Sequence, residues 1–388
     1  MLKALIFLTA FSQIFLSRFG FPVGESFSLA PSYIFLYAAL ITAVAKGLLF
    51  IDLKLLLIFS GVVLSSIVSF FFGEPEKTFT SLILYWFVYF PFVFKSCNTA
   101  SPAFLFYNLY YPLFLLLAFF GVLQFVAQFF FRPDWLFDFR QYIPDFLQNK
   151  NTMNTVIIIS GVTKSNGFFC LEPSFFSQYM SFGIILLGLF GQSFAYGFLF
   201  LFGLILSFSG TGVILYATGC IFLYKYFSKI NRVFILLALT IFLLFSILTS
   251  ENLLLSRMEE FKGGAGVRTS SAAMRFLTPR ITLAEGLSKS TCALFFGNGP
   301  GTISKVFRDF EGHDPVWAKL FFEYGLLGGF FLLVFLFFSV VSNSYRDYLF
   351  PLFFIQYIFL GGHLLNFDIV SFYVLYYKLV SFTDSRYF

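Results

Sequence analysis

The sequence predicts an all-α protein that crosses a membrane many times. Of its 388 residues, 59% are hydrophobic and 11% are charged, whereas soluble domains carry roughly 25% charged residues. Phenylalanine alone supplies 66 residues. One globular core cannot cover this much apolar surface, so we expect lipid to cover the rest. Transmembrane strands are not predicted, because segments of about ten residues with alternating polarity do not occur.

Each predicted span is an apolar window near the length that a helix needs to cross the hydrocarbon core, which is about 20 residues. About 11–12 such windows occur, and they form a single integral membrane domain over residues 1–388. The first, the seventh and the last are the weakest. The windows are 3–17, 30–45, 54–72, 79–94, 103–131, 174–191, 194–208, 211–227, 231–249, 316–341, 348–365 and 367–382.

Lysines and arginines in the short loops predict the orientation, because cytoplasmic loops carry an excess of these residues. If the spans alternate, most of these charges fall on one side, and both termini are then cytoplasmic. Two long polar segments, 132–173 and 250–315, then lie outside. The net charge of +6 mostly reflects this asymmetry. No base-reading motif or basic tail predicts a nucleic-acid partner.

The longer outer segment, 250–315, carries Arg257, Arg275 and Arg280. The apolar spacing around Arg275 and Arg280 predicts an amphipathic helix that lies on the membrane surface. Arginines on such a helix bind phosphate oxygens through paired hydrogen bonds or contact lipid headgroups, and the sequence leaves both roles open. The turn from Gly297 to Gly301, which contains Asn298, predicts backbone N–H groups that approach an anion.

The shorter outer segment ends where a predicted span begins. Glu172 precedes Pro173, which suits the first position of a helix because proline has no N–H to leave unpaired. Glu172 is either a simple capping acid or a carboxylate of the site. Lys164 is the nearest basic residue upstream.

The longer outer segment ends in the same way, with His313 followed by Asp314 and Pro315. Asp314 is a good helix cap. Lys319 and Glu323 follow four residues apart, so they share one helix face. Ionisable groups at membrane depth usually face the interior of a helix bundle. This pair either fixes helix packing or lines the site.

Cys170 and Cys292 follow no metal-ligand spacing. A disulfide between them is compatible with an outer location, but two unpaired buried thiols are the favoured interpretation.

Three stretches resemble the superfamily of O-antigen polymerases and O-antigen ligases. The first is the run from Gly167 to Ser174, which contains Glu172-Pro173-Ser174. The second is Arg275 followed by the turn 297–301. The third is the run from His313 to Gly328, which resembles the superfamily's histidine followed by Glu-x-Gly-Leu-x-Gly at a helix start. The order of the stretches, the span count and the large late outer loop agree with the superfamily.

The resemblance implies a helical glycosyltransferase architecture of the GT-C-like kind in the bacterial inner membrane, with its active site on the periplasmic face. It implies an enzyme that joins oligosaccharide repeats linked to undecaprenyl pyrophosphate, which serve as donor and acceptor. Membrane lipid and a polysaccharide chain-length regulator are the other expected partners. The donor is already activated, so no metal and no cofactor are implied.

The site residues are carried over on this resemblance. His313, Glu172 and Arg275 are the expected catalytic residues: Arg275 binds pyrophosphate, with Arg280 or Arg257, and His313 or Glu172 orients or deprotonates the acceptor. The expected substrate-binding residues are Arg280, Arg257, Lys164, Asn298, Lys319 and Glu323.

Two other functions stay open. An O-antigen ligase would move the polymer to lipid A–core, but ligases often carry Ser-Arg in the hairpin that here contains Ser209-Gly210-Thr211. That difference and the presence of Glu172-Pro173 favour a polymerase, although an arginine often found upstream of Glu-Pro is replaced by Lys164. A lipid-linked oligosaccharide flippase or transporter is less favoured, because transporters place charges near the midplane and repeat their halves.

Overall fold

The computed structural model describes residues 1–22, 28–96, 102–131, 133–149, 156, 158–159, 161–191, 194–227, 232–233, 240, 278–303, 315–341, 349–361 and 364–383. These residues are mostly helical. The first half contains α1 (Leu2–Phe15), α2 (Pro31–Ala45), α3 (Leu53–Phe72), α4 (Phe79–Tyr89), α5 (Pro102–Ala127), α6 (Pro173–Phe190), α7 (Phe194–Leu206) and α8 (Gly210–Leu223). The second half contains α12 (Thr278–Leu287), α13 (Thr291–Phe296), α15 (Val316–Val341), α16 (Phe350–Ile355), the π-helical turn η7 (Gln356–Leu360), α17 (Phe367–Val374), the π-helical turn η8 (Leu375–Leu379) and the 3-10 turn η9 (Val380–Thr383).

Four of the described helices are long and apolar enough to cross a membrane: Leu53–Phe72, Ala103–Ala127, Pro173–Phe190 and Val316–Val340. The predicted helical character is therefore confirmed, and these four helices fit an α-helical membrane protein, whereas the full count of 11–12 spans stays a prediction. Helices occur at the other predicted windows, whereas most of 231–249 lies outside the described residues.

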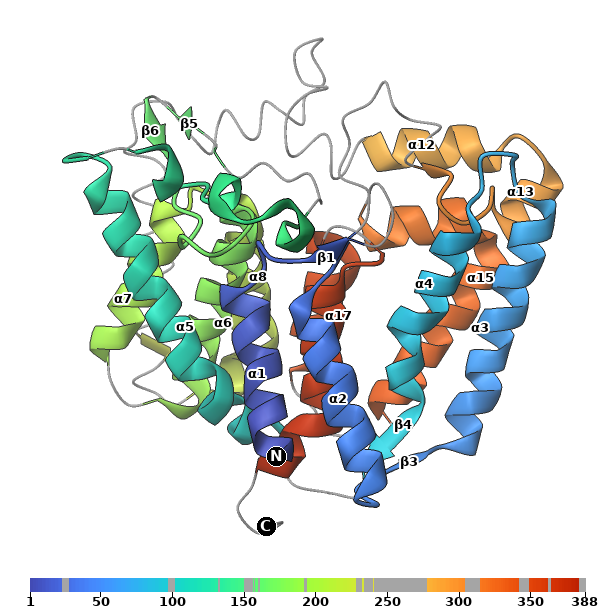
Figure 1. The fold of residues 1–388 in the computed structure, drawn as a ribbon, viewed down its shortest axis with the longest axis horizontal. Coiled ribbons are helices and arrows are strands. Elements are labelled where there is room, and N and C mark those ends of the chain that lie inside the picture. The colour runs from blue at the N-terminus through green and yellow to red at the C-terminus, as the bar shows by residue number, and fades with distance from the viewer. Residues whose placement is uncertain are drawn as a thin grey trace.

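The helices run side by side between two ends of the molecule (Figure 1). α1 begins and η9 ends at one of these ends, where the two helical segments also pack together. The described parts of the two long polar segments, including β5, β6, α12 and α13, lie at the opposite end. The described first and last helical segments therefore lie away from the described polar elements, and the side of the membrane on which each lies stays a prediction.

The described residues also form three short antiparallel ribbons, which the all-α expectation did not include. β1 (Phe21–Pro22) pairs with β2 (Ser28–Leu29), β3 (Leu49–Ile51) with β4 (Phe94–Ser96), and β5 (Ile158–Ile159) with β6 (Val162–Thr163). Each strand has two or three residues, too short for periodicity in the sequence to reveal. The β3–β4 ribbon ties the start of α3 to the end of the α4 segment.

Two groups of helices lie on either side of α1, α2 and α17 in Figure 1. α5, α6, α7 and α8 form one group, and α3, α4, α12, α13 and α15 form the other. The segment 349–361 connects the groups, because α16 packs against α8 and η7 packs against α15. The halves of the bundle are therefore held by a shared element.

Buried polar side chains bond to one another across this bundle. The Gln13 amide donates to the Ser371 hydroxyl at 2.8 Å, and the Gln356 amide donates to Gln178 Oε1 at 3.0 Å. The Ser32 hydroxyl donates to Asp368 at 2.6 Å. Such bonds hold helices together where lipid offers no partner for a polar group.

Candidate functional site

α15 is broken at Gly325, and this break organises the candidate site. Gly325 has φ 65° and ψ −170°, which interrupts the helix between Tyr324 and Leu326. This backbone conformation is essentially restricted to glycine. The break removes the regular intrahelical hydrogen bonds of the carbonyl groups just before it, and these groups must find other partners inside the protein.

The glycine turn 297–301 supplies those partners. The N–H of Asn298 donates to the Phe322 carbonyl at 2.9 Å, and the N–H of Gly299 donates to the Glu323 carbonyl at 3.0 Å. The Ser69 hydroxyl of α3 also donates to the Glu323 carbonyl, at 2.6 Å. The broken helix is therefore pinned by a turn and by a neighbouring helix.

Close approach explains the glycines of this turn. Gly297 has φ 80°, and a Cβ there would lie 2.4 Å from the Glu323 carbonyl group. A Cβ on Gly325 would lie 2.5 Å from the Gly297 nitrogen. The turn 297–301 and the break at Gly325 thus meet through backbone atoms, and the contact leaves no room for side chains.

The predicted tight turn is confirmed, but its N–H groups do not cradle an anion as expected. Those of Asn298 and Gly299 are used by the broken helix, and the N–H of Gly297 donates to the Ala293 carbonyl at 2.8 Å. The Asn298 side-chain amide also faces protein, with the carbonyls of Gly286 and Phe322 at 3.4 and 3.2 Å. These contacts give Asn298 a positioning role, and its contact with substrate stays a prediction.

Lys319 and Glu323 share one face of α15, as their spacing predicts. Lys319 Nζ lies 3.8 Å from Glu323 Oε1, and the side chains are 14% and 1% exposed. This distance fits an ion pair and is too long for a hydrogen bond. Lys319 therefore keeps part of its surface available to a ligand while neighbouring a deeply buried carboxylate.

Tyr85 of α4 is a neighbour of this pair that the sequence analysis did not single out. Its ring stacks on Tyr324, with 4.3 Å between centroids and 18° between planes. Its hydroxyl group is buried and has no hydrogen-bond partner among the described residues. One tyrosine among 21 carries no distinguishing sequence signal, so only the fold identifies it.

Glu172 stands at the start of α6, with Pro173 in the first turn as predicted. Its carboxylate is 4% exposed and accepts a hydrogen bond from the Ser174 hydroxyl at 2.7 Å. It makes no side-chain bond to the backbone of the helix start. Side-chain capping, the simpler of the two expected roles, is therefore absent.

Hydroxyl groups surround the start of α6. The Ser177 hydroxyl lies 3.4 Å from that of Thr211, which lies 2.9 Å from that of Ser209. Ser209 and Thr211 belong to the predicted hairpin between α7 and α8. The Glu172 carboxylate and these hydroxyls make one polar end of the α6–α8 pair.

Lys164 is 6% exposed and begins the stretch that leads to Glu172. The next residue, Ser165, donates from its hydroxyl to Gln124 Oε1 at 2.9 Å, and its N–H donates to the Leu206 carbonyl at 3.0 Å. These bonds fix the backbone at Lys164 against α5 and α7. The contact of Lys164 with pyrophosphate stays a prediction.

Arg18 is a second buried cation near this end that the sequence analysis missed. It donates to Asp138 at 2.8 Å and to the carbonyls of Phe137 and Cys170 at 2.8 and 3.0 Å. Burial lowers the pKa of Arg18 to about 10, and the charge of Asp138 opposes that shift, so Arg18 stays charged at neutral pH. It brings a positive charge to the segment that ends at Glu172, where Lys164 was the expected basic residue.

Three predicted residues, His313, Arg275 and Arg257, lie outside the described residues. Arg280 is described and exposed on α12, which packs against α15. Arg275 precedes α12 by three residues, and His313 precedes α15 by three.

The described site residues form two groups rather than one. Asn298, Lys319 and Glu323 meet at the break in α15, whereas Glu172 and Lys164 belong to the α6 side of the bundle (Figure 1). The hydrogen bond between Gln178 of α6 and Gln356 of η7 is a link between the two sides. Among the described residues, no three His, Cys, Asp or Glu side chains are grouped so that they could hold a metal ion.

Cys170, Cys220 and Cys292 are free thiols. The favoured interpretation of unpaired cysteines is confirmed for Cys170 and Cys292, but Cys292 is exposed rather than buried.

No family model, no curated protein and no solved structure matches this chain. Arguments about its function therefore rest on its own residues.

Proposed function

We propose that this chain polymerises oligosaccharide repeats linked to undecaprenyl pyrophosphate, at the periplasmic face of the bacterial inner membrane. The observation that carries the proposal is the pair of buried carboxylates at helix starts, Glu172 at α6 and Glu323 in the first segment of α15. Both helices have membrane length; Glu172 lies at the end of one long polar segment, and Glu323 follows the other. Buried ionisable groups on such helices are costly and usually functional.

The reaction exchanges one bond for another. The hydroxyl oxygen of the acceptor sugar bonds to the anomeric carbon of the donor glycan, and the bond from that carbon to pyrophosphate breaks. Undecaprenyl pyrophosphate leaves with the bonding electrons, and the hydroxyl proton passes to a base. A protein catalyses this step by holding the leaving anion and by orienting the hydroxyl.

In this proposal, cations of the α15 side hold the pyrophosphate. Lys319 is partly exposed beside Glu323, and Arg280 is exposed on the neighbouring α12. Arg275 and Arg257 belong to the same polar segment of the sequence. The break in α15, pinned by the turn 297–301, fixes the position of Lys319 relative to α12, since Asn298 bonds to carbonyls of both helices.

Glu172 and His313 are assigned to the acceptor. The Glu172 carboxylate is fixed by Ser174 and lies among small hydroxyl-bearing residues, surroundings that suit a sugar hydroxyl. Removing or orienting that proton typically contributes about 10²–10⁴-fold to a rate. The two groups of site residues would then correspond to the two substrates.

Deleting the gene in its host and separating the surface glycan on a gel tests this function. Loss of the ladder down to core with one repeat is expected. Complementation with Glu172→Gln and Arg275→Ala should not restore the ladder, although the wild-type gene does. Polymer retained on the lipid carrier, with no repeats on the core, would indicate a ligase instead. An unchanged ladder would contradict both enzymes and favour a transporter.

A further inference from the structure

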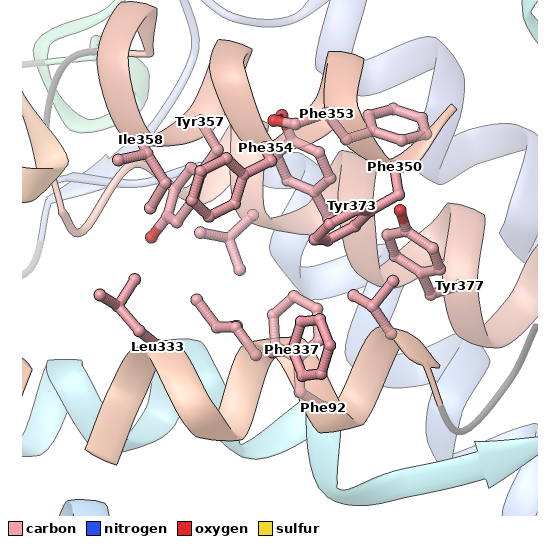
Figure 2. A pocket seen from close by; sticks show the side chains of 13 residues that line it. Phe92, Leu333, Phe337, Phe350, Phe353, Phe354, Tyr357, Ile358, Tyr373 and Tyr377 are labelled. Carbon is pink, nitrogen blue, oxygen red and sulfur yellow. Dashed lines mark hydrogen bonds between the residues drawn. The ribbon is translucent and has the colours of Figure 1, made fainter. Parts of the chain in front are cut away.

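A cavity of about 70 Å³ lies between the second segment of α15 and the paired segments α16–η7 and α17–η8 (Figure 2). Leu333 and Phe337 stand on one side, and Phe354, Tyr357 and Ile358 stand on the other. The complete lining is Phe92, Leu333, Leu336, Phe337, Val340, Phe350, Phe353, Phe354, Tyr357, Ile358, Val370, Tyr373 and Tyr377.

The cavity offers its occupant almost nothing polar. The Tyr373 hydroxyl is already bonded to the Phe353 carbonyl at 2.6 Å and to Gln356 Oε1 at 2.9 Å. The Tyr357 hydroxyl is bonded to that of Tyr89. Apolar cavities of this kind exclude water and accept hydrocarbon. The ligand class is therefore a hydrocarbon chain.

The cavity is reached from the apolar surface of the bundle. Phe337 and Phe354, on opposite walls, are 49% and 40% exposed. Phe337 belongs to a helix of membrane length, so the medium outside these side chains is lipid. A chain that enters between them comes from a membrane lipid.

The lining favours an isoprenoid chain over a saturated acyl chain. Eight of the 13 lining residues are aromatic. Branched and unsaturated isoprene units present flat faces and methyl groups, which pack well against aromatic rings. The carrier lipid in the proposed function is an isoprenoid of this kind.

The position of the cavity on α15 connects it to the site. Leu333 lies eight residues beyond the break at Gly325, which corresponds to about 12 Å along a helix. Lys319 and Glu323 lie on the other side of that break. We propose that the cavity holds the isoprenoid chain of the lipid carrier whose pyrophosphate is bound at the Lys319 side; this inference rests on the function proposed above.

Photolabelling of the full chain in lipid nanodiscs tests the inference. The probe is a polyprenyl pyrophosphate with a benzophenone on its chain, and the labelled peptides are identified by mass spectrometry. Leu336→Trp fills the cavity, whereas Phe338→Trp places the same new side chain at a 48% exposed position outside the lining. Val370→Phe fills the cavity from α17 and replaces Leu336→Trp if that variant does not fold.

Labelling is expected within 333–340 or 350–358 in the wild type and in Phe338→Trp. The filled variant should label about tenfold less, because losing contact with about two methylene groups costs that much affinity. Equal labelling of the filled and control variants would overturn the inference. Equal labelling of these peptides by a phosphatidylglycerol with a benzophenone acyl chain would overturn the isoprenoid assignment.

The two proposals fail in different ways. Cavity labelling by the polyprenyl probe combined with an unchanged glycan ladder in the deletion strain would contradict the polymerase and leave the lipid site standing. A collapsed ladder combined with labelling only outside the cavity would leave the polymerase standing and contradict the lipid site.

Discussion

The backbone N–H of Gly299 donates to the carbonyl oxygen of Glu323 at 3.0 Å. This bond joins the glycine turn 297–301 to the break in α15, two features that are separate in the sequence. It satisfies a carbonyl group that the broken helix leaves without its regular partner. The backbone that carries the buried Glu323 side chain is therefore held in place just before the break.

Substituting Gly325 should disrupt this arrangement. Gly325→Ala combines a strained backbone, which costs about 1–3 kcal/mol, with a Cβ placed 2.5 Å from backbone atoms of Phe295 and Gly297. Gly47→Ala is the matched control, because Gly47 has φ 68° but a Cβ there would meet nothing within 4 Å. Thermal unfolding of the purified proteins should show a clearly larger loss for Gly325→Ala. Equal losses would mean that the close contact is unimportant.

Variants of the Lys319–Glu323 pair distinguish a role in helix packing from a role in substrate binding. Glu323→Gln removes the carboxylate charge beside Lys319, and breaking a buried ion pair in this way costs about 3–5 kcal/mol. Because Lys319 is 14% exposed, we expect a cost at the lower end of this range. The double variant Lys319→Met/Glu323→Gln should recover most of that stability in thermal unfolding.

Glycan production gives the second readout for this pair. If Lys319 binds pyrophosphate, the double variant stays inactive on the gel although it is folded. Recovery of the full ladder together with stability would assign the pair to helix packing alone.

Glu172→Gln should abolish most polymer while leaving the fold intact, because it keeps the size of the side chain and removes the charge. A loss of about 10²–10⁴-fold is expected for a residue that accepts or orients the acceptor proton. Ser174→Ala, which removes the 2.7 Å hydrogen bond to Glu172, should cause a smaller loss.

Ser181→Ala is the control for this series. Ser181 is buried in the same helix, and among the described residues its hydroxyl donates to the carbonyls of Ser177 and Gly212. Its substitution removes a hydroxyl without touching Glu172, so activity should be retained. If Ser174→Ala and Ser181→Ala lose similar amounts of polymer, the loss in Ser174→Ala comes from altered helix packing and not from the bond to Glu172.

Local sequence patterns predicted local structure well. Pro173 at the start of α6, the i to i+4 spacing of Lys319 and Glu323, and the glycine turn all appear as expected. Each depends on neighbours within a few residues, for which periodicity and proline or glycine chemistry suffice.

Long-range contacts were not predictable in the same way. Arg18 reaches Asp138 and the Cys170 carbonyl across 120 and 152 residues of sequence. The N–H groups of Asn298 and Gly299 are used by α15 rather than by an anion, which depends on where the helix breaks. Such partners are fixed by tertiary packing, and a single sequence does not encode them as a local pattern.

Cys170 should resist alkylation into the alkaline range. Burial raises the pKa of its thiol from 9.0 to about 12, and Arg18 opposes that shift. In variants that retain one cysteine, Cys292, which is exposed, should react with maleimide near neutral pH, whereas Cys170 should stay unreactive until the protein unfolds. Fast labelling of Cys170 in folded protein would contradict its burial.

The same pKa shift predicts how stability depends on pH. A raised pKa means that the folded state binds the thiol proton more tightly than the unfolded state. The free energy of unfolding should therefore fall as pH rises from about 9 to about 12. Cys170→Ser lacks this contribution, so its stability should fall less over the same range. Parallel curves for the two proteins would exclude the effect.

The most direct measurement uses the purified chain in lipid vesicles with the host's single repeat linked to undecaprenyl pyrophosphate. The proposed function predicts a ladder of lipid-linked oligomers, with one undecaprenyl pyrophosphate released for each bond formed. Glu172→Gln should give no ladder under the same conditions. Folded wild-type protein that binds the lipid-linked repeat but forms no oligomer would contradict the polymerase.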